Sequence, residues 1–105
     1  MAESLENWAS GNWMVKEGME EEFIKRWKDW LGWSSENIAG FVSATLIRDT
    51  QNPRHFVSFS PWESDKARDE WKSSGGFQEK FALVREMCDD FQGSDYSLAA
   101  TFSAK

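Results

Sequence analysis

The order of its hydrophobic periods is the feature that most constrains the fold of this chain. Apolar residues recur with the two-residue period of strands or the 3.6-residue period of helices, in the order strand, helix, strand, strand, helices, strand. That order is typical of the split β-α-β unit, the ferredoxin-like arrangement, in which helices cover one face of a four-stranded antiparallel sheet. The sequence therefore predicts an α+β domain of βαββαβ order with one extra short helix.

The first half of the chain predicts a strand, a helix and a hairpin. A strand is expected over Trp8–Lys16, where both alternating faces carry large apolar side chains. A helix follows over Met19–Trp33, with apolar residues every three or four positions and three glutamates in the first turn, where the helix dipole stabilises carboxylates. Two β-rich segments, Gly40–Arg48 and Arg54–Ser60, flank the turn-forming run 49–53 and are predicted to pair as a hairpin.

The second half predicts two helices and a final strand. The first helix begins at one of two caps, either Ser60, which is followed by proline at the first helical position, or Ser64, and runs to about Ser74. A third helix is expected over Phe77–Phe91, where apolar residues recur at spacings of four and three. The strict alternation over Asp95–Ala104, with one apolar face and one face of small, semi-polar side chains, predicts the last strand.

Length, charge and cysteine content exclude several classes of function. A chain of 105 residues forms one domain, predicted over residues 8–105 after a flexible segment at 1–7. The 12 Lys and Arg against 18 Asp and Glu give a formal net charge of −6, which argues against nucleic-acid and membrane-surface binding. No apolar run approaches the roughly 20 residues of a membrane span, and the N-terminus lacks a basic-then-apolar signal. The single cysteine allows no internal disulfide, which predicts a cytoplasmic location. With one histidine and one cysteine, neither a structural zinc site nor a thiol–imidazole triad is easy to build.

Aromatic rings are the most distinctive part of the composition, with seven Trp, eight Phe and one Tyr. Several of them project from the predicted helices or the first strand toward the space between helices and sheet, namely Trp13, Phe23, Trp27, Trp71 and Phe81. Two interpretations stay open. Such rings line a pocket for a flat hydrophobic ligand, or they fill an ordinary hydrophobic core.

Few polar side chains are candidates for acid–base chemistry. His55 is the sole imidazole and suits a general base near neutral pH, although its place after a turn also fits an exposed surface histidine. Three other polar side chains could position a substrate oxygen, namely Asn12, Arg48 and Tyr96. Each also has a structural explanation: Asn12 fits a subunit interface, Arg48 flanks a turn, and Tyr96 packs its ring while its hydroxyl meets water. Cys88 lies on the inward stripe of the third predicted helix, which favours a small buried hydrophobe over a reactive thiol.

Several motifs occur together in a specific order. They are Trp13–Gly18 before the glutamate-rich helix, Asn37–Asp49, Phe56–Ser64, Trp71–Ser74 and Phe77. Over nearly the whole chain, from about Trp8 to Phe102, the sequence resembles the antibiotic biosynthesis monooxygenase (ABM) family of dimeric α+β barrels. The resemblance implies a homodimer in which sheet packs on sheet, and this agrees with a second sheet face that carries little charge and needs a cover.

The resemblance also bears on haem. Haem-degrading members use an Asn-Trp-His set in which the iron-ligating histidine follows the tryptophan by ten residues. Trp71 matches the tryptophan, but the histidine position is Phe81, which has no lone pair for iron. The asparagine position falls at Gly11, with Asn12 one residue away on the opposite face. The known arrangement for haem degradation is therefore incomplete here.

The quinone-forming members imply the leading hypothesis. In them the anion of a phenolic polycyclic substrate reacts directly with O₂, without flavin or metal. We therefore expect a monooxygenase without a bound cofactor or metal that acts on a hydrophobic, planar, polycyclic or quinol-like molecule. The alternative is a non-catalytic protein that holds a ligand, haem included, in the same cavity. A third possibility is a dimerisation module with a filled core.

Overall fold

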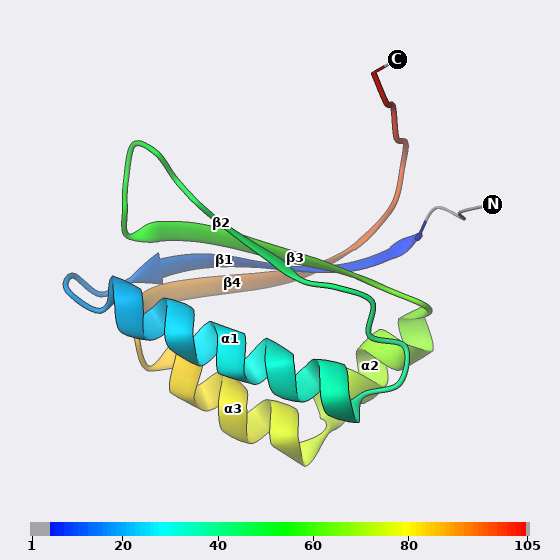
Figure 1. The fold of residues 1–105 in the computed structure, drawn as a ribbon, viewed down its shortest axis with the longest axis horizontal. Helices are drawn as coiled ribbons and strands as arrows, with labels where there is room; N and C mark the ends of the chain where they lie inside the picture. The colour runs from blue at the N-terminus through cyan, green and yellow to red at the C-terminus, as the bar shows by residue number, and fades with distance from the viewer. Residues whose placement is uncertain (1–4, 105) are drawn as a thin grey trace.

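The computed structural model describes residues 5–104, with the helices on one side of a single sheet (Figure 1). The elements follow in the order β1 (Asn7–Val15), α1 (Glu20–Asn37), β2 (Thr45–Arg48), β3 (His55–Trp62), α2 (Asp65–Ser73), α3 (Gly75–Arg85) and β4 (Cys88–Ser97). The strand order is β2-β3-β1-β4, and every pair is antiparallel. The predicted ferredoxin-like α+β class is thereby confirmed.

The core lies between the helices and the face of the sheet that carries alternate residues of β1 and β3. On β1 these include Trp13 and Val15, which are almost fully buried, and on β3 they include Phe56 and Trp62. Because side chains alternate along a strand, the residues between them point to the other face of the sheet. No helix of the described residues covers that face (Figure 1). The sheet therefore has a buried face and an open face, and the two carry different kinds of side chain.

Two helix boundaries differ from the prediction. Helix α1 continues past Gly32 and Trp33 to Asn37, and Ser34 in this last part is completely buried, so tertiary packing extends the helix beyond its local stop signals. Helix α2 is capped by Ser64, whose Oγ accepts a hydrogen bond from the backbone N–H of Ala67 at 3.0 Å. The alternative cap at Ser60 is wrong, because residues 60–62 still belong to β3.

The predicted third helix over Phe77–Phe91 is too long, and Gly93 does not end it. Helix α3 stops at Arg85, and Cys88 and Phe91 lie on β4, both facing the helices. Two strand residues three apart normally face opposite sides, but the pairing with β1 shifts between Met14 and Val15. This irregularity turns both side chains inward and imitates the spacing of a helix.

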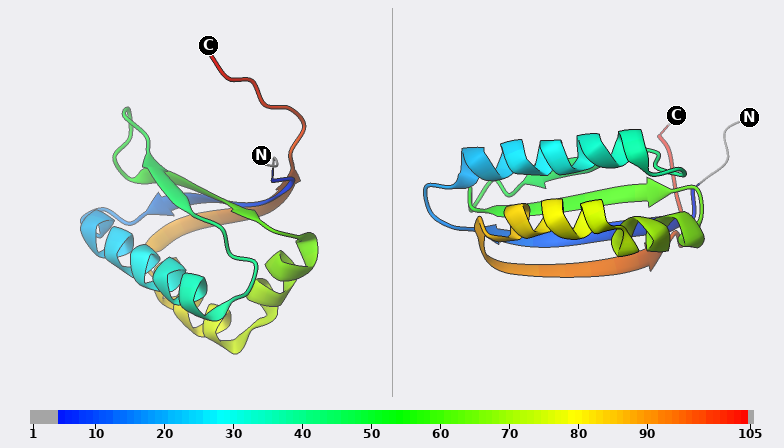
Figure 2. Two further views of the ribbon diagram at one scale, coloured as in Figure 1. Left: turned by 45° about the vertical axis from the view of Figure 1, so that its right-hand side comes forward. Right: turned by 90° about the horizontal axis from the view of Figure 1, so that it is seen from below.

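The predicted strand Asp95–Ala104 is displaced by the same error. Strand β4 ends at Ser97, and the backbone N–H of Leu98 makes one further bond, to the carbonyl of Glu6 at 2.8 Å. Residues 98–104 form no strand with the described residues and leave the sheet on the side away from the helices (Figure 2).

The hairpin is also shorter than predicted on one side. Strand β2 covers only Thr45–Arg48, while Phe41 makes an isolated bridge to Trp62. The predicted flexible segment at 1–7 includes residues 1–4, which lie outside the described residues, whereas Asn7 already pairs with Trp62 in the sheet. Within residues 5–104 no helix is both long and apolar enough to cross a membrane.

Candidate functional site

A cavity of about 330 Å³ lies between the sheet and the helices. This volume is within the range of small-molecule sites, at its lower end. Its walls come from β1, β3 and β4 and from all three helices, and the lining is mainly apolar. The rings that line it include Trp13, Trp27, Trp30, Trp71, Phe77 and Phe81. The space between helices and sheet is thus not completely filled by the protein's own side chains.

The helical wall of the cavity is a network of rings held by hydrogen bonds. Trp30 of α1 stacks on Trp71 of α2, with centroids 5.4 Å apart and planes 15° apart. The indole N–H of Trp71 donates to Ser34 Oγ at 2.7 Å, and the Ser34 hydroxyl donates to the Trp30 carbonyl at 2.8 Å. Because Ser34 links both tryptophans, the stacked pair is fixed in place before any ligand arrives.

The floor of the cavity is formed by backbone. Gly11 of β1 and Gly93 of β4 are direct partners in the sheet, and both line the cavity. A Cβ at Gly11 would lie 2.7 Å from Trp13 Nε1 and 2.9 Å from Ser58 Oγ, and one at Gly93 would lie 3.0 Å from Phe91 Cζ. Glycine is therefore the residue that lets the neighbouring indole and hydroxyl approach the sheet here.

The polar atoms of the lining are few. Ser58 and Ser60 of β3 are buried, and each hydroxyl oxygen accepts an indole N–H, from Trp13 at 2.9 Å and from Trp62 at 3.1 Å. The indole N–H of Trp30 is buried without a hydrogen-bond partner among the described residues. Buried donors without partners cost free energy, so an oxygen of a ligand would stabilise this lining.

One basic side chain lies at the cavity. Lys72 of α2 lines it and forms an ion pair with Asp95 of β4, and Arg68 lies 3.8 Å from the same carboxylate. Arg68 also donates to the Trp8 carbonyl at 3.1 Å, which ties α2 to β1. These contacts place positive charge beside the cavity, where it favours an anionic over a neutral guest.

Four of the five predicted pocket residues, Trp13, Trp27, Trp71 and Phe81, line this cavity. Phe23 lies outside the lining, in the core, with its ring centroid 5.4 Å from that of Trp13. Four further lining residues were not predicted from the sequence, namely Trp30, Phe77, Ser58 and Ser60. The helical spacing of Trp27 and Trp30 contained the signal for Trp30, whereas small hydroxyl residues inside a β-rich run gave none.

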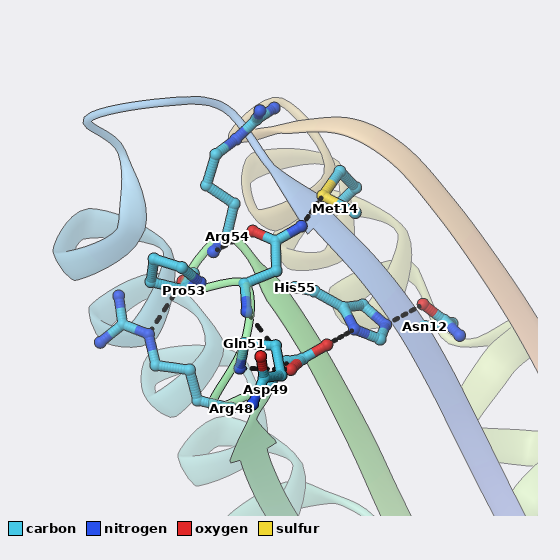
Figure 3. Close-up of polar contacts among 9 residues, drawn as sticks. Asn12, Met14, Arg48, Asp49, Gln51, Pro53, Arg54 and His55 are labelled. Atoms are coloured by element: carbon cyan, nitrogen blue, oxygen red, sulfur yellow. Dashed lines mark hydrogen bonds and ion pairs between the residues drawn. The ribbon is translucent and has the colours of Figure 1, made fainter.

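The predicted polar candidates lie on the open face of the sheet. Figure 3 shows His55 between Asp49 and Asn12, with His55 Nδ1 2.9 Å from Asp49 Oδ2 and Nε2 2.8 Å from Asn12 Oδ1. The pKa of the Asp49 carboxyl is lowered from its ordinary value, mainly by the hydrogen bond with His55. Tyr96 pairs with Trp8 on the same open face and is 56% exposed. The sheet backbone separates this group from the cavity of the same subunit.

Arg48, the remaining polar candidate, belongs to the hairpin. Its Nε donates to the Pro53 carbonyl at 2.9 Å, and its guanidinium lies 4.9 Å from the centroid of the Phe56 ring. Arg48 therefore closes the turn between β2 and β3 and does not line the cavity.

The residues that line the cavity do not fit the axial ligation of haem. Iron in haem proteins is held by His, Cys, Met or Tyr side chains. The lining, as far as the described residues form it, contains none of these, and Phe81 and Trp71 offer rings only. Residues 5–104 also contain no group of three or more acidic, histidine or cysteine side chains that could hold a metal ion. We therefore derive no chemistry through an iron centre.

The fold and the cavity define a class of protein, a ferredoxin-like α+β domain that keeps an aromatic-lined hollow between its helices and its sheet. The sequence model of the antibiotic biosynthesis monooxygenase (ABM) family matches residues 5–82. The match covers well over half of the chain, so the chain belongs to this family.

Several solved structures share this fold. SnoaB, a cofactor-independent oxygenase from Streptomyces nogalater, is 18% identical, with 96% of this chain and 100% of that chain covered and a TM-score of 0.83. A conserved protein from Methanosarcina mazei Go1 is 20% identical, over 88% of this chain and 91% of that chain, with a TM-score of 0.77. Protein SO0527 from Shewanella oneidensis is 18% identical over 91% and 93%, with a TM-score of 0.77. No curated protein matches significantly in sequence.

Proposed function

We propose that this protein is a monooxygenase that oxidises a hydrophobic, planar, polycyclic or quinol-like molecule with O₂ and without a bound cofactor. The observation that carries the proposal is the unfilled cavity, whose stacked rings suit a flat guest. Membership of the ABM family supports a monooxygenase-type reaction. SnoaB, which shares the fold, is a cofactor-independent oxygenase.

The proposed reaction is written for an anthrone-type CH₂ group beside aromatic rings. Loss of one proton gives a delocalised anion, which transfers electrons to O₂ and forms a new C–O bond. The carbon keeps one oxygen atom as a carbonyl, and the other oxygen leaves as water with the two hydrogens of the CH₂ group. The substrate is thus the reductant and O₂ the oxidant, so no further redox partner is required. The protein contributes a dry cavity, ring stacking and hydrogen bonds to the anion.

The proposed substrate pocket comprises Trp13, Trp27, Trp71 and Phe81, with Trp30 and Phe77 added from the structure. Asn12, His55 and Tyr96 are proposed as residues of the subunit interface, because they project from the open face of the sheet. A cytoplasmic location, expected from the cysteine content, is part of the proposal.

A homodimer through the open face is also proposed. This face carries apolar side chains that no helix covers, among them Trp8, Ile47 and Phe59, with Ile47 51% exposed. A second copy would bury them by packing sheet on sheet. Size-exclusion chromatography with light scattering at micromolar concentration tests this, and we expect a dimer for the native chain and a monomer for Ile47→Glu. A native chain that runs as a monomer would contradict the dimer.

The enzymatic proposal is tested by O₂ uptake with anthrone and hydroquinone-type compounds. We expect acceleration over buffer with the native protein and a loss of most of it in Trp27→Ala, which removes a ring from the cavity wall. Trp33→Ala is the control, because Trp33 packs on α3 outside the lining. No acceleration across the panel would overturn the monooxygenase.

A binding protein without catalysis is the second candidate. Lys72 is the sole titratable side chain among the described residues of the lining, and it is already paired with Asp95. The lining therefore offers no free side chain to take the proton of the substrate, which favours binding without catalysis. Tight binding of anthrone without O₂ uptake would support this candidate over the monooxygenase.

A further inference from the structure

Two serine hydroxyls in the cavity are held in the same unusual way. Ser58 and Ser60 are two residues apart on β3, so their side chains lie on the same face, about 7 Å apart along the strand. Both line the cavity, and they are 8% and 5% exposed. Each accepts a hydrogen bond from a buried indole N–H, Ser58 from Trp13 and Ser60 from Trp62.

The direction of these bonds determines what the hydroxyls have left to offer. An indole nitrogen can only donate, so each serine oxygen acts as the acceptor. The O–H of each serine then remains, and neither has an acceptor among the described residues. A hydroxyl that accepts one hydrogen bond becomes a better donor in a second one, because hydrogen bonds in a chain polarise one another. Ser58 and Ser60 therefore face the cavity as two donors of enhanced strength.

We infer that Ser58 and Ser60 are the groups that bind the oxygen atoms of the ligand. This inference rests on the proposed function, in that the cavity must take a flat guest, and it assigns the residues that recognise the oxygen atoms of that guest. A carbonyl or phenolate oxygen at the ring edge satisfies the two hydroxyls, while a plain hydrocarbon leaves both buried donors without a partner. The unpartnered indole N–H of Trp30 and the ammonium of Lys72 are also donors, so the lining favours a guest that carries acceptors.

The inference predicts a preference that two matched probes measure. Anthrone carries a carbonyl oxygen, and 9,10-dihydroanthracene has the same three-ring outline without it. We expect the native protein to bind anthrone at least roughly tenfold more tightly, as measured by quenching of tryptophan fluorescence. In Ser58→Ala and Ser60→Ala this preference should fall by roughly three- to tenfold, the size expected for one lost hydrogen bond. Binding of dihydroanthracene should stay within about twofold, because no ring is removed.

Ser34→Ala is the control, because Ser34 is also a buried serine that accepts an indole N–H but has no free hydroxyl to offer a ligand. It is completely buried and accepts an indole N–H from Trp71, but its own O–H already donates to the Trp30 carbonyl, and it lies outside the lining. All three variants leave an indole N–H without its acceptor, so a merely structural effect would appear in all of them. Movement of the Trp30 and Trp71 rings in Ser34→Ala would change the affinity for both probes alike, so we expect the preference for anthrone over dihydroanthracene to be unchanged.

The outcomes separate this inference from the proposed function. An anthrone preference that survives in both Ser58→Ala and Ser60→Ala overturns the inference, as does an equal loss in Ser34→Ala. If those variants lose the preference but the native protein shows no O₂ uptake, the oxygen-binding role stands and the monooxygenase fails. If neither probe binds the native protein, the cavity takes no flat guest and both ideas fail.

Discussion

Gly76 is the position where one added methyl group tests the packing of α3 on α1 most directly. A Cβ at this position would overlap the indole ring of Trp33 at Cζ2 and Cη2, far inside van der Waals contact. At Gly75, one residue earlier in the same helix, a Cβ would meet nothing within 4 Å. The two glycines therefore form a matched pair for the same substitution, since both begin α3 and neither has a positive φ.

The expected effects have opposite signs. Replacing glycine by alanine where space is free stabilises a protein by about 0.4–1 kcal/mol, because the unfolded chain loses freedom. At Gly76 the indole of Trp33 must move out or α3 must shift, and overpacking of this kind costs about 1–3 kcal/mol. We therefore expect the free energy of unfolding to fall by about 1–2 kcal/mol in Gly76→Ala and to rise by up to about 1 kcal/mol in Gly75→Ala.

Urea denaturation followed by far-ultraviolet circular dichroism measures both values, and thermal scans provide a second readout. For a domain of this size, 1 kcal/mol shifts the Tm by about 4–8 °C. Tryptophan fluorescence should change in Gly76→Ala and stay native-like in Gly75→Ala, because only the first displaces Trp33. A Gly76→Ala protein as stable as Gly75→Ala would refute the contact between α3 and Trp33.

Three further predictions concern a cap and two titratable groups. Ser64→Ala should lower the free energy of unfolding by about 0.5–2 kcal/mol in urea titrations, because α2 loses its N-terminal cap. Burial raises the pKa of the Cys88 thiol from 9.0 to about 11, so the unfolded state ionises first. Native stability relative to Cys88→Ala should therefore decline between about pH 9 and 11, and a constant difference would contradict this. The pKa of Asp49 is lowered, so its stabilising effect is present at neutral pH and is lost as the pH falls below the ordinary carboxyl range. Thermal scans from pH 6 to 3 should show this loss in the native chain and not in Asp49→Asn.

The fold was largely predictable because its elements carry strong periods. The stripe of α1 determined which side of the helix faces the core, and Trp27 was placed correctly on that basis. Along β1 both alternating faces carry large apolar side chains, so the alternation by itself did not determine which face meets the helices. The boundary between α3 and β4 was not predictable in the same way. Cys88 and Phe91 keep a helical spacing on a strand because the pairing with β1 is irregular there, and that depends on a distant part of the chain.

The cavity was only partly predictable for a related reason. Rings at helical spacing point toward the sheet whether the space behind them is full or empty, so Trp71 and Phe81 looked the same in both cases. What distinguishes the cases is the opposite wall, where Gly11 and Gly93 meet across two strands that are far apart in sequence. That pairing depends on register, which the alternation of side chains leaves open to shifts of two residues.

The facing glycines also bear on how a protein of this shape could change its guest. Since part of the depth of the cavity comes from the missing side chain of Gly93, a single methyl group there would make the cavity shallower without contacting a tryptophan. At Gly93 the nearest obstacle is the edge of the Phe91 ring at 3.0 Å, a tight but yielding neighbour. Guest size is thereby adjustable from the sheet side of the cavity, across from the stacked tryptophans of α1 and α2, and selectivity for larger or smaller molecules can be altered there.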